Sequence, residues 1–149
     1  MVNQLDPLEC GLAYMKNLKT ATFGVRFRFG VHREVYLWVH KYVLNNSSRQ
    51  FRILHQSIQL ARRSSGWAED YPLEAYCVVI RWMYTRDLNF TIDLGQFCMT
   101  EGPFPEGHTV LDGLMANPVR KAEQSDVVGL ANLYQLTELQ ELLDSHSDN

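Results

Sequence analysis

The sequence predicts a mixed α/β (α+β) domain in which a sheet and further helices surround one very apolar helix. Residues 70–88 form that helix, because their apolar side chains recur at three- and four-residue spacing over most of its circumference. Residues 23–40 alternate apolar and polar side chains in two runs joined by a glycine-containing turn, which is typical of a β-hairpin. Residues 125–143 carry two more apolar stripes at helical spacing. These flanking segments can cover the apolar helix on several sides.

Length and charge indicate one globular domain. The chain has 149 residues and a net charge of −3, so we expect a single domain over 1–149 and no direct contact with nucleic acid. No apolar run reaches the ~18 residues of a membrane span, and we expect neither a signal peptide nor a membrane partner. Cys10, Cys77 and Cys98 are odd in number and irregularly spaced, unlike a disulfide framework or a zinc site. We therefore expect the protein in the cytoplasm or the nucleus.

An N-terminal helix is expected at about 6–18. Asp6 is followed by a proline, which is typical of a helix start. Leu8, Leu12 and Met15 then fall on one apolar stripe. Because such a short helix is marginal alone, it must pack either on its own domain or on a second copy of the chain. The residues leave both arrangements open.

The clearest strand is 23–29, where apolar side chains alternate with a glycine and two arginines. In the second strand Tyr36, Trp38 and His40 alternate with aliphatic residues, so we expect an unusually aromatic outer face. Basic residues lie in or beside the hairpin at Arg26, Arg28, Arg33 and Lys41. We interpret them as a solvated sheet face rather than a nucleic-acid contact, because the domain is not net basic.

Another helix is expected after the hairpin. Ser47 or Ser48 can cap it. Apolar residues then repeat at helical spacing, namely Phe51, Leu54, Ile58 and Ala61. A polar break at 62–66 separates this helix from the central one. His40 stands at the strand-to-helix corner, and we interpret it as structural because no carboxylate or cysteine is spaced to pair with it.

The central helix has its own start signals. We expect Asp70, just ahead of a proline, to cap it, and Glu74 to interact favourably with its dipole in the first turn. The buried stripe is expected to contain Ala75, Tyr76, Val79, Ile80 and Met83, widened by Trp82 and Tyr84.

Residues 89–124 are expected to form a long, mostly irregular insert, because three prolines and four glycines interrupt it. Within it we expect only a short strand at 90–92 and a helical turn at 111–115. Ser125 or Asp126 is then expected to cap the last helical pair. Its stripes contain Val127, Leu130, Ala131 and Tyr134, then Leu139, Leu142 and Leu143.

Three blocks of the chain resemble the BTB/POZ domain family. They are Asp70-x-Pro-x-x-Ala-Tyr76 with Tyr84-Thr85-x-x-Leu88, then Val39-His40-Lys41-x-x-Leu44 with Phe51, and finally Ala131-x-x-Tyr134-x-Leu136-x-x-Leu139. The blocks follow the family's order, and the insert resembles the longer inserts of fungal-type BTB sequences. This resemblance implies a BTB/POZ fold, a small and mostly antiparallel sheet flanked by a cluster of helices. The family's third strand would fall near 67–68, where the sequence allows only a short one.

The resemblance also implies a protein–protein interaction module that forms a homodimer or recruits a partner. In the family the N-terminal helix packs on the second copy, and the matching residues here are Leu8, Leu12 and Met15. A partner such as a cullin scaffold or a peptide of a regulatory protein would contact the surface that matches His40, Lys41, Phe51, Leu54, Ile58 and Tyr84.

Two narrower roles within the family meet departures in this chain. A substrate adaptor of a cullin-based ubiquitin ligase usually carries an acidic residue after the phenylalanine, whereas Ile58-Gln59-Leu60 lacks it, and the chain ends before the helices that extend that contact. A transcriptional co-regulator pairs an acidic residue on the first strand with a basic one after the histidine. Lys41 fits the basic position, but Gly24 stands where the acid is expected.

An enzyme is the least favoured class. The five histidines are scattered, and the sequence has no phosphate-binding loop, nucleophile elbow or zinc-type cysteine pair. Asp87 and Asp93 are interpreted as solvated carboxylates rather than as an acid–base pair. We therefore expect no catalytic residues, no cofactor and no metal.

Overall fold

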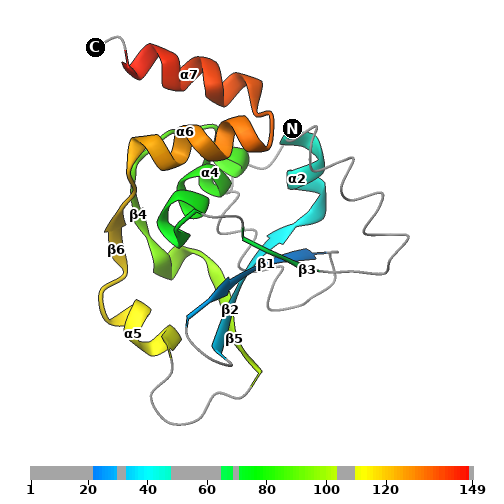
Figure 1. The fold of residues 1–149 in the computed structure, drawn as a ribbon, viewed down its shortest axis with the longest axis vertical. Helices are drawn as coiled ribbons and strands as arrows, with labels where there is room; N and C mark the ends of the chain where they lie inside the picture. The colour runs from blue at the N-terminus through cyan, green and yellow to red at the C-terminus, as the bar shows by residue number, and fades with distance from the viewer. Residues whose placement is uncertain (1–21, 30–32, 48–64, 69–70, 104–109, 148–149) are drawn as a thin grey trace, which may run out of the picture.

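The computed structural model describes residues 22–29, 33–47, 65–68, 71–103 and 110–147, and the mixed α+β class is confirmed (Figure 1). The strands are β1 (Thr22–Arg28), β2 (Arg33–His40), β3 (Ser65–Trp67), β4 (Thr91–Asp93), β5 (Cys98–Pro103) and β6 (Val119–Lys121). The helices are α2 (Lys41–Ser47), α4 (Leu73–Thr85), α5 (Val110–Ala116), α6 (Gln124–Leu133) and α7 (Thr137–Ser147), with a 3₁₀ turn at Leu94–Gln96.

The main sheet has the strand order β3-β1-β2-β5. β1 and β2 are antiparallel, which confirms the predicted hairpin. Val25 lies opposite Leu37 and Phe27 lies opposite Val35, and all of these side chains are buried. β5 extends the sheet antiparallel to β2, while the short β3 runs parallel to β1. The sheet is therefore small and mostly antiparallel, and its third strand is as short as expected.

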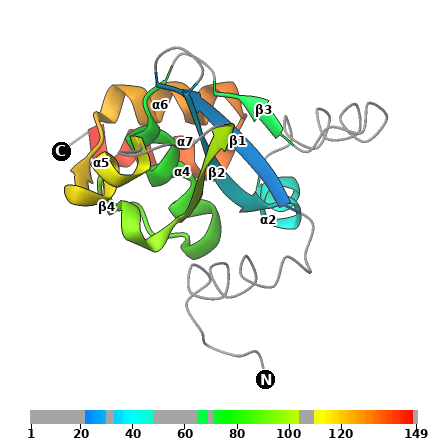
Figure 2. The ribbon, with the colours of Figure 1, turned by 90° about the horizontal axis from the view of Figure 1, so that it is seen from below.

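α4 packs between the sheet and α6, and α7 packs against α6 on the far side (Figures 1 and 2). Tyr76 on α4 contacts both neighbours, because its ring centroid lies 5.2 Å from that of Phe27 and 6.4 Å from that of Tyr134. The buried residues of α4 are Leu73, Ala75, Tyr76, Cys77, Val78, Val79, Ile80, Trp82 and Met83. The prediction of a helix buried over most of its circumference is confirmed.

Two predicted helix caps are wrong. The N-cap of α4 is Pro72, with φ −72° and no side-chain hydrogen bond, while Asp70 lies outside the described residues. Proline already holds the extended backbone that an N-cap needs. α6 begins at Gln124 after an N-cap at Glu123, so its acidic residue Asp126 lies inside the first turn instead of ahead of it. There it can still interact with the helix dipole, as Glu74 does in α4.

The insert at 89–124 is more regular than expected. β4 and α5 confirm the short strand and the helical turn, but the sequence reasoning missed β5 and β6. Gly102 and Pro103 indicated a loop, yet β5 is the edge strand of its sheet, where proline is tolerated because one side needs no hydrogen bonds. The carboxylate of Glu101 on β5 accepts hydrogen bonds from the backbone N–H groups of Val110 and Leu111, at 3.0 and 3.1 Å, and so fixes the start of α5.

The C-terminal helical pair closes the core as predicted. Val127, Leu130 and Ala131 of α6 are buried, and so are Leu139 and Leu143 of α7. The turn between the helices places Gln135 in the left-handed region, at φ 53°. Cys77 and Cys98 are free thiols. Within the described residues, no helix combines the length and the hydropathy of a membrane span.

Candidate functional site

The structure places the predicted partner residues in two groups. Leu8, Leu12 and Met15, together with Phe51, Leu54 and Ile58, lie outside the described residues. His40, Lys41 and Tyr84 are described and lie at one corner, where β2 runs into α2 and α4 ends. The family resemblance grouped these three residues on one surface, whereas the direct contact between His40 and Tyr84 depends on how α4 packs against the sheet.

His40 and Tyr84 are joined by two short contacts. The backbone N–H of His40 donates a hydrogen bond to the Tyr84 hydroxyl at 3.0 Å, and Nδ1 of His40 lies 2.7 Å from the same oxygen. The His40 side chain is only 1% exposed. His40 was expected on the outer aromatic face and on the partner surface, but α4 covers it through Tyr84. The pair therefore fixes the corner between β2, α2 and α4, and of the three described partner residues Lys41 and Tyr84 are partly exposed.

The Tyr84→Phe variant should lose about 1–3 kcal/mol of unfolding free energy. The substitution removes the hydroxyl that hydrogen-bonds with the backbone N–H of His40 and lies 2.7 Å from its Nδ1. Urea unfolding measures this loss. Tyr71→Phe is the matched control, since the Tyr71 hydroxyl makes no hydrogen bond within the described structure, and it should stay within about 0.5 kcal/mol of the parent. Equal losses in the two variants would contradict a role for the His40–Tyr84 contact.

Acidification should weaken the domain through His40. Burial lowers the pKa of His40 below its ordinary value of 6.5. Because the pKa is then lower in the folded chain than in the unfolded chain, the contribution of His40 is fully present above pH 6.5 and is lost as the pH falls below it. Urea unfolding between about pH 7.5 and 5.5 should show a smaller loss for His40→Gln than for the parent. Parallel pH profiles would refute this assignment.

The outer face of the sheet carries a stacked aromatic pair. The rings of Tyr36 and Trp38 on β2 lie 5.5 Å apart with an interplanar angle of 11°. Both side chains are partly exposed. The described helices α4 and α6 lie behind the opposite face of the sheet (Figure 2). We call the surface formed by Gly24, Tyr36, Trp38 and Thr100 the aromatic platform.

Each ring of the aromatic platform is held in place. The indole Nε1–H of Trp38 donates a hydrogen bond of 2.8 Å to Oγ1 of Thr100 on β5. A Cβ atom at Gly24 would stand only 3.0–3.2 Å from three ring carbons of Trp38, so glycine lets the indole rest directly on β1. This contact gives a structural reason for glycine where the family resemblance led us to expect an acid.

Tyr36 is positioned by charged neighbours. Its hydroxyl donates a hydrogen bond of 2.9 Å to Oε2 of Glu34. Burial and then this hydrogen bond raise the pKa of Tyr36, while nearby Arg26 partly offsets the effect. The hydroxyl is therefore protonated at neutral pH and keeps the ring in a fixed orientation. The aromatic outer face predicted from the hairpin is confirmed at Tyr36 and Trp38, but not at His40.

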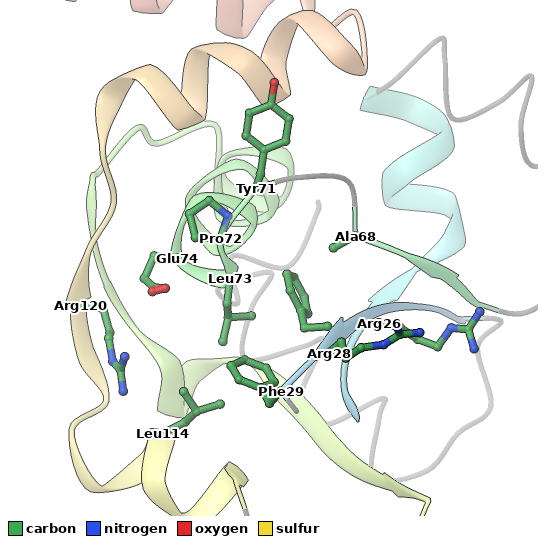
Figure 3. Close-up of a pocket in the computed structure, with 11 residues that line it drawn as sticks. Arg26, Arg28, Phe29, Ala68, Tyr71, Pro72, Leu73, Glu74, Leu114 and Arg120 are labelled. Atoms are coloured by element: carbon green, nitrogen blue, oxygen red, sulfur yellow. The ribbon is translucent and has the colours of Figure 1, made fainter. Parts of the chain in front are cut away.

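A hollow of about 630 Å³ lies between the end of β1, the start of α4, and α5 with β6 (Figure 3). We call it the basic hollow, because Arg26, Arg28 and Arg120 line it against one described carboxylate, Glu74. Phe29, Leu73 and Leu114 form part of its apolar wall. The sequence reasoning missed this site, since its residues come from four separated segments and carry no motif.

The described residues were compared with the groupings that hold metal ions. Among them, no three His, Cys, Asp or Glu side chains lie close enough together to hold a metal ion. The described residues that line the basic hollow include no histidine or cysteine beside Glu74. What the arrangement offers is an aromatic face and a basic hollow, both suited to recognition.

Comparison with models of known protein families gives no match for this chain. Comparison with curated proteins gives no match either. Membership of the BTB/POZ family therefore stays a prediction from the three sequence blocks.

Proposed function

We propose that this chain is a protein–protein interaction module of the BTB/POZ type that binds a second copy or another protein through the outer face of its sheet. The observation that carries the proposal is the aromatic platform, with Tyr36 and Trp38 stacked and partly exposed. Tyrosine and tryptophan are enriched among the residues that dominate binding energy at protein interfaces. Side chains already held in one orientation lose little conformational entropy on binding.

The order of the elements also supports the proposal. A hairpin leads through α2 to a short β3 parallel to β1, followed by α4 and a closing helical pair. The sequence blocks that resemble the BTB/POZ family occupy the hairpin corner, α4 and α6–α7 in this order. Self-association through Leu8, Leu12 and Met15 remains part of the proposal.

A ubiquitin-ligase adaptor or a transcriptional co-regulator would be a narrower form of this function. For the cullin surface, the described structure offers Tyr84, whose hydroxyl is engaged with His40. For the co-regulator pocket it offers Lys41, while position 24 holds a glycine that lies against the Trp38 ring. No observation favours either form, and a positive pulldown with a cullin N-terminal region would favour the first.

A double variant tests the aromatic platform. Tyr36→Ser with Trp38→Ser should weaken self-association or partner binding at least about tenfold, because it removes both aromatic anchors. Sedimentation equilibrium measures self-association, and affinity capture from cell extract compares bound proteins. Val119→Ser with Leu133→Ser is the matched control, since it removes two exposed apolar side chains from other surfaces, 65% and 37% exposed. The proposal would be refuted if the parent chain were a monomer at every concentration and if every protein that it captured also bound the Tyr36→Ser, Trp38→Ser variant equally well.

A further inference from the structure

β6 is an edge strand with an accessible outer side. It pairs with β4 in the small second sheet, and within the described part of the chain no strand pairs with its other side. β4 contacts α4, and Figure 1 shows β6 beyond β4 at the margin of the molecule. The side chain of Lys121 is exposed, and that of Val119 is 65% exposed. Solvent therefore reaches the outer edge of β6.

The hydrogen bonds of this sheet determine which backbone groups point outward. The N–H of Ala122 donates a hydrogen bond of 2.8 Å to the carbonyl oxygen of Phe90, and the N–H of Leu94 donates one of 2.9 Å to the carbonyl oxygen of Pro118. Since bonded positions alternate along an antiparallel ladder, residues 118, 120 and 122 direct their backbone groups toward β4. The N–H and C=O groups of residues 119 and 121 therefore point away from β4. Pro118 lacks a donor only on the side that faces β4.

Lys121 gives this edge a charge preference. Within the described residues it makes no ion pair, and it lies opposite the uncharged Thr91. The carboxylate on β4, that of Asp93, lies opposite Val119 instead. Opposite charges on directly facing residues stabilise strand pairing. A strand added outside β6 is therefore favoured when it places a carboxylate opposite Lys121.

A second copy of β6 fits this edge less well than an acidic strand does. Antiparallel pairing of two copies would bring Arg120 and Lys121 of one strand close to the same two residues of the other. Like charges on neighbouring strands are destabilising. The charges thus favour a different protein as the occupant of the edge.

We infer that the outer edge of β6 binds an extended acidic segment of a partner protein as an added antiparallel strand. The segment exchanges backbone hydrogen bonds with Val119 and Lys121, which is the mode of strand addition to an exposed sheet edge. It places an aspartate or glutamate opposite Lys121 and, two residues later, a β-branched residue opposite Val119. The inference rests on the proposed function, since a partner protein supplies the segment, but it uses a surface other than the aromatic platform.

The test uses the full chain and a capped peptide of about seven residues, in which one glutamate precedes a valine by two positions among threonines. NMR titration measures affinity, and amide hydrogen exchange locates the added strand. We expect binding at submillimolar concentration, with new protection of the Val119 and Lys121 amides and little change at Arg120, whose amide faces β4. A peptide N-methylated at the residues that face β6 should bind at least about tenfold more weakly, because it lacks the required donors.

Charge exchange between chain and peptide tests the role of Lys121. Lys121→Glu should weaken binding of the glutamate peptide about threefold to tenfold. A peptide with lysine in place of the glutamate should show the opposite preference and bind the Lys121→Glu variant better than the parent. A merely structural role of Lys121 would not reverse the preference between the two peptides.

Substitutions at Val119 test the backbone contact. Val119→Pro removes an N–H that points outward and should weaken binding at least about tenfold, while the hydrogen bonds to β4 stay in place. Val119→Ser is the matched control, since it keeps that N–H, and its affinity should stay within about threefold of the parent. The amide spectrum of each variant shows that it is folded.

Four outcomes would overturn the inference. The glutamate peptide could fail to bind at millimolar concentration, the new protection could fall elsewhere, or the N-methylated peptide could bind equally well. Protection of the Val119 and Lys121 amides that grows with the concentration of the chain alone would identify a second copy as the occupant. The proposed function fails separately, because Tyr36→Ser with Trp38→Ser should leave peptide binding unchanged, and absence of peptide binding would leave the aromatic platform untouched.

Discussion

Val78→Asp is expected to leave the chain unfolded at 25 °C. Val78 lies on α4 and is 0% exposed, so the new carboxylate would have to be buried among apolar neighbours or protonated. The cost should exceed about 4 kcal/mol, which is comparable to the whole stability of many domains. Circular dichroism and urea unfolding check the result.

Val119→Asp is the control for this change, because it introduces the same carboxylate at a position that is 65% exposed on β6. It should change the unfolding free energy by no more than about 0.5 kcal/mol. A folded and cooperative Val78→Asp variant would show that α4 does not lie at the centre of the core. The fold and both proposed surfaces depend on that arrangement, since α4 supports the inner face of the sheet.

Leu139→Ala should destabilise the domain by about 2–5 kcal/mol. Leu139 is 0% exposed on α7, so the substitution removes buried apolar surface and leaves a cavity. α7 packs on α6, and α6 packs on α4, so the loss should appear in the unfolding of the whole domain. Urea unfolding followed by tryptophan fluorescence measures it.

Leu133→Ala provides the comparison, because Leu133 is 37% exposed at the end of α6 and should lose no more than about 1 kcal/mol. If Leu139→Ala instead gave a separate early transition and left the main one unchanged, α7 would not belong to the cooperative core. The C-terminal sequence block would then say little about the fold.

The aromatic platform is separated from this core. Tyr36 and Trp38 alternate along β2 with the buried Val35, Leu37 and Val39, so their side chains lie on the other face of the strand. Their substitution should therefore alter binding without the large stability losses expected at Val78 and Leu139. This separation makes the binding experiments interpretable, because a variant that binds poorly can be shown to be folded.

Much of the fold could be predicted from local patterns. The alternation of side chains in the hairpin and the helical stripes of α4, α6 and α7 depend on the period of each element, and buried faces must repeat with that period. β5 was missed because a glycine and a proline argue against a central strand, whereas its position at the sheet edge tolerates both. The caps of α4 and α6 were misplaced because the first residues of a helix depend on backbone angles that the pattern does not specify.

The candidate sites were less predictable than the fold. The aromatic face could be predicted because Tyr36 and Trp38 lie two residues apart on one strand. The burial of His40 could not, because the residue that covers it comes from the end of α4. The basic hollow could not either, since Arg120, Glu74 and Phe29 are brought together only by the packing of β6, α4 and β1.

By itself, the sequence determined the class of the fold and the faces that its helices and strands bury, because hydrophobic periodicity acts over a few neighbouring residues. Only the tertiary structure decided which side chains meet across elements: Tyr84 with His40, the Trp38 ring with Gly24, and the arginines with the apolar wall of the hollow. Such contacts depend on the distances and angles between packed elements, and a one-dimensional pattern does not contain them.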